Sequence, residues 1–251
     1  MIEMQVNIPT KVGQMSTFIC HPDRHGPHPV VLVFMDAPGI REELRDMSRR
    51  LATVGYYVLL PNLYYRSGVE ELGPFMGEAG AAVRQKIMEL MAGLTIDMVM
   101  DDTDALLDFT RKESGASQDL IGCVGYCMSG QYALSAAARH LDRIAAAASI
   151  YGTHLMTDQS DSPHLSMRRA KAEFYIACAE IDHFAPVELV APLRDSLRQA
   201  GVKAEVELYP GVEHGFAFPQ RPSYDKAAAE RHWERLFALF AGTLKREKSG
   251  S

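Results

Sequence analysis

The segment Ile121–Gln131, with the sequence IGCVGYCMSGQ, constrains the fold more than any other part of this 251-residue chain. An apolar run typical of a buried strand ends at Tyr126, and an alanine-rich helical stretch follows within a few residues. Cys127 therefore falls on a sharp strand-to-helix turn. In such a turn, the residues two positions before and two positions after the central residue must be small, because strand and helix pass close to each other there. Here these residues are Gly125 and Ser129.

Along the rest of the chain, short apolar runs rich in strand-forming residues alternate with helical stretches. The predicted strands are 30–35, 56–60, 121–126, 146–151, 174–177 and 204–208, with 14–20 as a candidate antiparallel edge; the predicted helices include 42–54, 130–140, 187–200 and 224–243. Continuous apolar strands separated by helices predict an α/β fold: a doubly wound, mostly parallel sheet with helices on both faces. We expect a single domain over 1–245, a helical insertion over 66–112 near the active site, and a flexible tail over 246–251.

Composition narrows the function classes. The chain is 47% hydrophobic and carries a formal net charge of -6, so we expect neither nucleic acid nor an anionic membrane as its partner. No apolar run approaches the roughly 18 residues that span a bilayer, and the N-terminus does not resemble a signal peptide. Four cysteines in a chain of this length do not indicate a disulfide framework. These features predict a cytoplasmic protein.

A thiol nucleophile needs a base, and the base needs an acid that orients it. In folds with this turn, the acid and then the histidine follow the nucleophile in chain order, each after a strand. Asp182 and His214 lie in such positions. Taken singly, Cys127 could be a buried structural cysteine, Asp182 a helix N-cap and His214 a surface residue, but their joint occurrence favours a catalytic triad. His183 is a poorer base because it is adjacent to Asp182.

The same architecture predicts two backbone donors for an oxyanion. One is the amide of Met128, directly after the cysteine. The other lies in the loop after the strand 30–35, where Pro38 has no N–H and Ala37 is therefore the better donor. Asp36, in the same loop, would raise the pKa of the thiol by like-charge repulsion, unless it is only a turn residue.

Four motifs together resemble the dienelactone hydrolases (carboxymethylenebutenolidases), a cysteine branch of the α/β-hydrolase fold. They are Gly125-Tyr-Cys-Met-Ser-Gly130, Asp182-His-Phe-Ala-Pro186, His214-Gly-Phe-Ala217 and the segment Gly55–Tyr64. The resemblance implies cofactor-free hydrolysis of an enol lactone through a thioester on Cys127. It also implies a base at His214, an orienting acid at Asp182, and oxyanion donors at Ala37 and Met128. The family has a glutamate where Asp36 stands.

The chain departs from this family where the substrate carboxylate is bound. The family places one arginine four residues after the histidine, where Phe218 stands here, and another near Ala81. The candidate substrate-binding residues are Tyr64, Arg66, Arg84, Phe216 and Phe218. We therefore expect a monomeric hydrolase of small esters or lactones, without cofactor or metal, whose pocket suits more apolar esters.

Two other classes of function are open at this point. A catalytically altered relative would keep the fold and act as a binding protein. A thiol redox sensor would use Cys127 with Cys123 as its resolving partner. A metal site at these two cysteines is disfavoured because their spacing is not Cys-x2-Cys and no second ligand pair follows.

Overall fold

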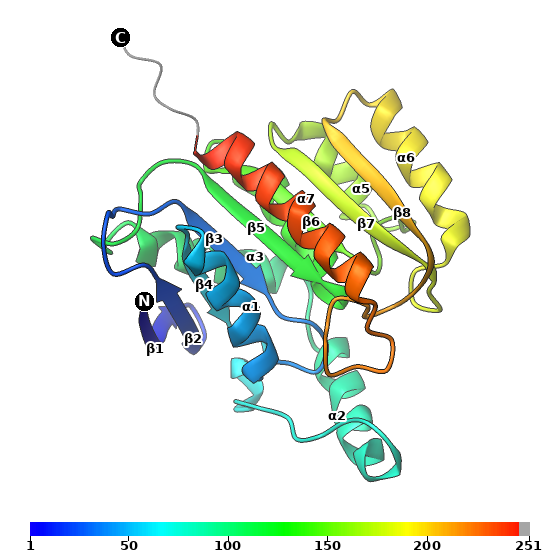
Figure 1. The fold of residues 1–251 in the computed structure, drawn as a ribbon, viewed down its shortest axis with the longest axis horizontal. Helices are drawn as coiled ribbons and strands as arrows, with labels where there is room; N and C mark the ends of the chain where they lie inside the picture. The colour runs from blue at the N-terminus through cyan, green and yellow to red at the C-terminus, as the bar shows by residue number, and fades with distance from the viewer. Residues whose placement is uncertain (246–251) are drawn as a thin grey trace. The chain divides into compact units, whose positions relative to one another are not determined.

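A computed structural model describes residues 1–245, so the tail predicted for 246–251 lies outside the described residues. The chain divides into two compact units, Met1–Gln118 and Asp119–Ser251, called here the N-terminal and C-terminal units. Each unit combines strands with covering helices (Figure 1). Each is described separately.

The strands of the N-terminal unit lie in the order β1-β2-β4-β3. They are β1 (Ile2–Thr10), β2 (Gly13–His21), β3 (Val30–Phe34) and β4 (Tyr57–Pro61). β1 and β2 pair antiparallel, as do β2 and β4, whereas β3 and β4 are parallel. Every residue of β3 and β4 is buried, which explains their continuous apolar sequences. The predicted segment 14–20 is confirmed as the antiparallel strand β2, but it is not the edge: β2 pairs with β4 on one side and with β1 on the other. The edge strand is β1, which was not predicted.

Helices and short 3₁₀ turns complete this unit. They are α1 (Glu42–Thr53), η1 (Tyr65–Ser67), η2 (Glu78–Gly80), α2 (Ala81–Ala92) and α3 (Ile96–Thr110). α1 packs on β2 and β4, and α3 packs on β1. The segment 66–112, which was expected to be helical, contains α2 and α3. α3 belongs to the packing of the N-terminal unit, since it buries Val99, Leu106 and Leu107.

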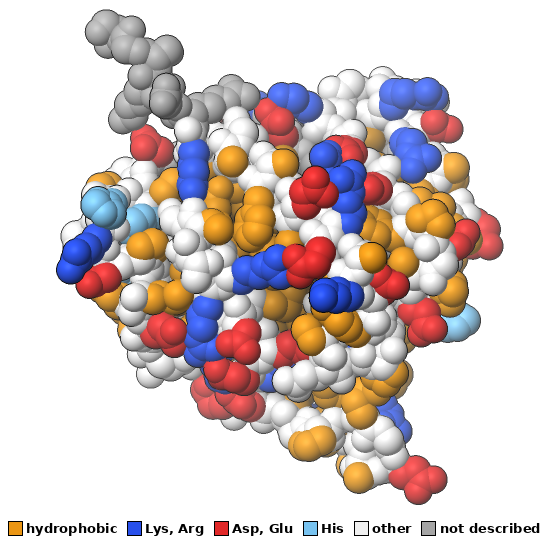
Figure 2. Space-filling view, viewed as in Figure 1, with side chains coloured by type: hydrophobic (Ala, Val, Ile, Leu, Met, Phe, Trp, Pro, Cys, Tyr) orange, Lys and Arg blue, Asp and Glu red, His pale blue; other side chains and the backbone are white. Residues whose placement is uncertain are grey.

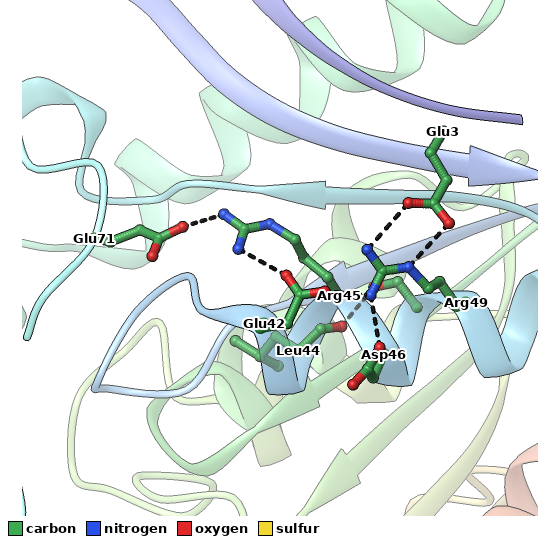
Figure 3. Close-up of polar contacts among 8 residues, drawn as sticks. Glu3, Glu42, Leu44, Arg45, Asp46, Arg49 and Glu71 are labelled. Carbon is green, nitrogen blue, oxygen red and sulfur yellow. Dashed lines mark hydrogen bonds and ion pairs between the residues drawn. The ribbon is translucent and has the colours of Figure 1, made fainter. Parts of the chain in front are cut away.

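Arginines on α1 tie this helix to two other segments (Figure 3). Arg49 pairs with both carboxylate oxygens of Glu3 on β1, at 2.9 and 3.0 Å, and its guanidinium lies over the ring of Phe18. Arg45 pairs with Glu71, in the loop that precedes α2. Both pairs join sequence-distant parts of the N-terminal unit, and the two-point geometry of the Arg49–Glu3 pair makes it more specific than an isolated surface pair.

The C-terminal unit contains four parallel strands among its described residues, in the order β5-β6-β7-β8. Its elements are β5 (Ile121–Tyr126), η3 (Cys127–Ser129), α4 (Gly130–Arg139), β6 (Ile144–Ile150), α5 (Pro163–Ser166), η4 (Met167–Arg169), β7 (Glu173–Ile181), η5 (Val187–Leu189), α6 (Val190–Gln199), β8 (Ala204–Glu213) and α7 (Lys226–Leu244). The predicted strands and helices of this unit are confirmed, with β7 and β8 each several residues longer than expected.

Helices cover both faces of this parallel sheet, as predicted. On one face of β5, the space beside Gly122 is filled by α7, because a Cβ there would lie 2.8 Å from the ring of Phe240. On the other face, the thiol of Cys123 donates to the carbonyl of Ala133 on α4. Figure 1 shows α7 running across β5 and β6, in agreement with its contacts. The carboxyl ends of the strands remain available for loops.

The surface carries mixed charge. On the face drawn in Figure 2, acidic and basic side chains are interspersed among polar and apolar ones. Among the residues that the structure describes, no helix combines the length and apolar character needed to cross a bilayer.

We predict that Arg49→Ala lowers the free energy of unfolding by about 1 kcal/mol, because the paired guanidinium and its ring contact are both lost. Denaturant unfolding in low salt measures the change. The difference from wild type should shrink in 1 M NaCl, where exposed ion pairs are screened. An effect that is unchanged by salt would show that the ion pairs do not carry the stabilisation.

Candidate active site

Cys127 lies where β5 meets α4, in the left-handed backbone region with φ of 53°. A non-glycine residue rarely adopts this conformation, which costs about 1–2 kcal/mol. Cys127 is 9% exposed, so the thiol is covered yet reachable. The strand-to-helix turn expected from the sequence is therefore present, with the strained backbone that such a turn requires.

Two glycines make this turn possible. A Cβ on Gly125 would lie 2.0 Å from the carbonyl oxygen of Ser129, and a Cβ on Gly130 would lie 2.6 Å from the Cα of Gly152. Backbone thus approaches backbone on both sides of the cysteine, leaving no room for a side chain. The sequence argument placed the small residues at Gly125 and Ser129, and Gly130 adds a second close approach.

Asp182 and His214 meet at the ends of β7 and β8. Asp182 lies just past β7, and its Oδ2 is 2.7 Å from Nδ1 of His214. Its other oxygen, Oδ1, accepts from the backbone amides of Phe184 at 2.8 Å and Ala185 at 3.0 Å. The carboxylate is therefore held from both sides. The backbone amide of His214 donates to the carbonyl of Ile181, which joins the two loops.

The environment of His214 favours its charged form. Burial by itself lowers the pKa of His214, but the hydrogen bond with Asp182 and the neighbouring Cys127 thiol together raise it to about 9. Nε2 of His214 is buried, and no described group meets hydrogen-bond geometry with it. Because Cys127 contributes to the raised pKa of His214, its thiol lies near the ring, although its sulfur forms no hydrogen bond with Nε2. Such a hydrogen bond often tightens only when substrate is bound.

Two aromatic side chains that the sequence argument did not assign flank the imidazole. The ring of Tyr151 lies edge-on to His214 at 4.9 Å between centroids, and the ring of Phe184 lies at 5.0 Å. Phe184 belongs to the quoted Asp182–Pro186 motif, so a sequence signal for it existed. Tyr151 follows β6 with φ of 39°. Tyrosine rarely adopts this conformation, so the sequence carried no signal for its position.

In the N-terminal unit, Asp36 is fully buried and engaged by an arginine. Arg41 donates to both carboxylate oxygens of Asp36, at 2.5 and 3.1 Å, and also pairs with Glu43. Tyr64 donates to the carbonyl of Ala37 at 2.8 Å, which steadies the loop after β3. Arg41 was not identified from the sequence, because a charge five residues from Asp36 carries no distinctive spacing.

The two candidate arginines of the N-terminal unit are committed to protein groups. Arg66 forms a two-point pair with the buried Asp102, at 2.7 and 2.8 Å, and Arg84 donates to the carbonyls of Phe75 and Gly77. These contacts favour structural roles for both side chains. The geometry therefore does not support binding of a substrate carboxylate by either of them.

Phe216 and Phe218 are fully buried. Phe216 stacks on Tyr209 at 4.9 Å and meets Tyr151 edge-on, while Phe218 meets the edge of Tyr126. Both rings therefore belong to the aromatic core of the C-terminal unit. They support Tyr151 from behind, and this contact links them to His214 indirectly.

Among the described residues, no three His, Cys, Asp or Glu side chains gather as a metal site would require. Cys123 is completely buried, and burial raises the pKa of its thiol. A neutral, enclosed thiol is a poor resolving partner for Cys127, which weakens the redox-sensor hypothesis.

Comparison with known proteins agrees with this architecture. The dienelactone hydrolase family matches residues 15–244. The chain belongs to this family. Two curated relatives named "Putative carboxymethylenebutenolidase" are similar to it: one from Escherichia coli O157:H7 is 31% identical, over 93% of this chain and 84% of the relative, and one from Methylorubrum extorquens is 30% identical, over 94% and 79%.

A solved structure described as "Putative Dienelactone Hydrolase", from Klebsiella pneumoniae, is also similar to this member of the dienelactone hydrolase family. The two superpose with a TM-score of 0.84 at 26% identity, over 96% of this chain and 98% of the other. The α/β-hydrolase fold and the carboxymethylenebutenolidase type of hydrolase expected from the sequence are thereby confirmed.

We predict that Gly130→Ala destabilises the C-terminal unit by about 1–3 kcal/mol, because the added methyl group must push Gly152 away. The matched control is Gly242→Ala on α7, where a Cβ meets nothing within 4 Å. There alanine should stabilise the helix slightly through its better helix propensity. Equal thermal unfolding of the two variants would contradict the close approach.

We also predict that Cys127→Ala and Asp182→Asn each lower the pKa of His214 from about 9 toward its ordinary value of 6.5, since each removes an interaction that raises it. Titration of the imidazole by NMR measures this. The folded-state pKa lies above the unfolded value, so charged His214 stabilises the fold fully below about pH 6.5 and loses that contribution as pH rises through 9. A His214 pKa unaffected by both substitutions would contradict the assignment.

Proposed function

We propose that the protein hydrolyses small esters or lactones by acyl transfer to Cys127, with His214 as base and Asp182 as its orienting acid. The observation that carries the proposal is a cysteine in strained backbone at a strand-to-helix turn, together with a His214 whose Nδ1 is hydrogen-bonded to Asp182. Side chains held for packing alone do not need the backbone strain.

In the proposed acylation step, His214 takes the proton of the thiol and the sulfur attacks the carbonyl carbon. The tetrahedral oxyanion accepts hydrogen bonds from the backbone amides of Met128 and Ala37. The carbon–oxygen bond to the alcohol or enol then breaks, and protonated His214 gives its proton to the departing oxygen. The product of this half-reaction is a thioester on Cys127.

In the second half-reaction, His214 removes a proton from water, which attacks the thioester carbonyl. The carbon–sulfur bond breaks, the acid is released and the thiol regains its proton. The backbone amides of Phe184 and Ala185 donate to Oδ1 of Asp182 and keep its carboxylate in place during both steps. The imidazole therefore keeps the orientation that presents Nε2, the nitrogen not bound to Asp182, to the reacting atoms.

The contacts of Asp36 and of the candidate binding residues change the roles that we propose for them. Arg41 pairs with Asp36 as well as with Glu43, so we propose that Asp36 affects a thiol less than an unpaired carboxylate would. Tyr64 is proposed to act by holding the carbonyl of Ala37, which steadies the loop that carries the N–H of Ala37. The names of the relatives favour an enol lactone as substrate, whereas the engaged arginines favour esters without a carboxylate.

We predict that Cys127→Ala lowers kcat/KM at least 1,000-fold for both an activated acetate ester and a dienelactone, because the acyl acceptor is lost. The matched control is Cys123→Ala, which removes a buried thiol on the same strand and should keep most of the activity. Iodoacetamide should inactivate wild type with one label on Cys127, located by mass spectrometry.

Unchanged turnover of Cys127→Ala on both substrates would refute the nucleophile assignment. Absence of hydrolysis by the wild-type protein on a panel of esters and lactones would instead favour the binding-protein alternative. Formation of a Cys123–Cys127 disulfide by hydrogen peroxide would favour the redox sensor.

A further inference from the structure

The C-terminal unit contains a cavity of about 140 Å³ beside Asp182. It lies between the loop after β6, the end of β7 and the start of α6. Its walls include Tyr151, Leu155, Asp182, Phe184, Val190 and Leu193. The volume is close to that of an apolar cavity known to hold a benzene ring, which is about 150 Å³.

The wall of this cavity is mostly apolar, and no Lys or Arg is among the residues that line it. The carboxylate of Asp182 is already satisfied by His214 and two amides. Burial raises the pKa of Cys178 to about 12, so its thiol is neutral. His154 is exposed, and its Nδ1 lies 3.0 Å from the hydroxyl of Thr153.

Three wall residues connect the cavity to the candidate active site. Tyr151 and Phe184 line it and also contact the imidazole of His214, and Asp182 lines it while holding that ring. The rim is unusually apolar for a surface, since Phe184 is 69% exposed and Leu189 is 44% exposed. Exposed apolar side chains that border a cavity are typical of a ligand-binding site.

We propose that this cavity binds the uncharged apolar substituent of the substrate, up to about the size of a benzene ring. The inference rests on the proposed function and sharpens it, because it names the substrate class as neutral esters or lactones with one small hydrophobic group. A carboxylate in this position would be buried among apolar walls without a counter-ion, which is costly. The substituent enters past Phe184 and places the scissile bond near His214.

Kinetics on three esters test the proposal. Ethyl acetate has no ring, ethyl phenylacetate carries a phenyl ring on the acyl side, and benzyl acetate carries one on the alcohol side. Val190→Phe fills the cavity from α6. We expect it to lower kcat/KM at least about tenfold for one of the two phenyl substrates, the scale expected for losing burial of a ring, and less than about twofold for ethyl acetate. An equal loss on all three esters would overturn the proposal.

A second variant enlarges the cavity and keeps the test decisive if Val190→Phe does not fold. Leu193→Ala should raise the preference for a naphthyl ester over the matching phenyl ester. Its control is Leu197→Ala, one turn further along α6, buried but not part of the cavity wall. The same change in preference in both variants would show that loosened packing, and not the cavity, sets specificity.

Binding of fluorobenzene, followed by ¹⁹F NMR, supplies a readout that needs no catalysis. We expect saturable binding to Cys127→Ala, loss of it in the Cys127→Ala, Val190→Phe double variant, and competitive inhibition of the wild type against the phenyl ester. No binding, or binding without competition, overturns the proposal; the latter would mark a site for a free apolar molecule. If Cys127→Ala keeps full turnover while fluorobenzene still competes, the cavity assignment stands and the nucleophile assignment falls.

Discussion

The close approach of backbone to backbone around Cys127 is the constraint on which the rest of the site depends. Gly125 faces the carbonyl of Ser129, and Gly130 faces Gly152, with no space for a side chain at either contact. Strand, helix and the loop after β6 are thereby held together, and the amide of Thr153 donates to the carbonyl of Cys127 at 3.1 Å. The cysteine takes up the resulting strain in its own backbone.

That loop also carries the other features that surround the imidazole. Tyr151 begins it and lies against His214, and the residues after Gly152 form one wall of the apolar cavity. The loop after β7 supplies Asp182, the two amides that hold it, and Phe184 on the other side of the ring. The groups that orient the imidazole and the apolar side chains around it thus come from the same two loops. A change in one of these loops therefore affects both the orientation of His214 and the apolar cavity.

Membership in the dienelactone hydrolase family agrees with this arrangement, and the side chains around it suggest a different substrate preference. Arg66 and Arg84 are held by protein groups, and Phe218 is buried in an aromatic core. The expectation that these residues meet the substrate came from their positions in the sequence. Their partners, Asp102 for Arg66 and the carbonyl of Phe75 for Arg84, are distant enough along the chain that no local pattern reveals them.

The sequence by itself determined the parallel strands, the turn at Cys127 and the order in which Asp182 and His214 follow it, because these depend on local periodicity and on small residues at fixed spacing. It also carried a signal for β1 that the prediction missed, because the apolar and polar residues of this strand alternate with the period of two typical of a half-exposed strand. Tertiary structure alone decided that Arg41 pairs with Asp36 and that Asp182 borders a mostly apolar cavity without Lys or Arg. Both result from side chains brought together by folding, and a linear pattern does not encode which of several possible partners comes within reach.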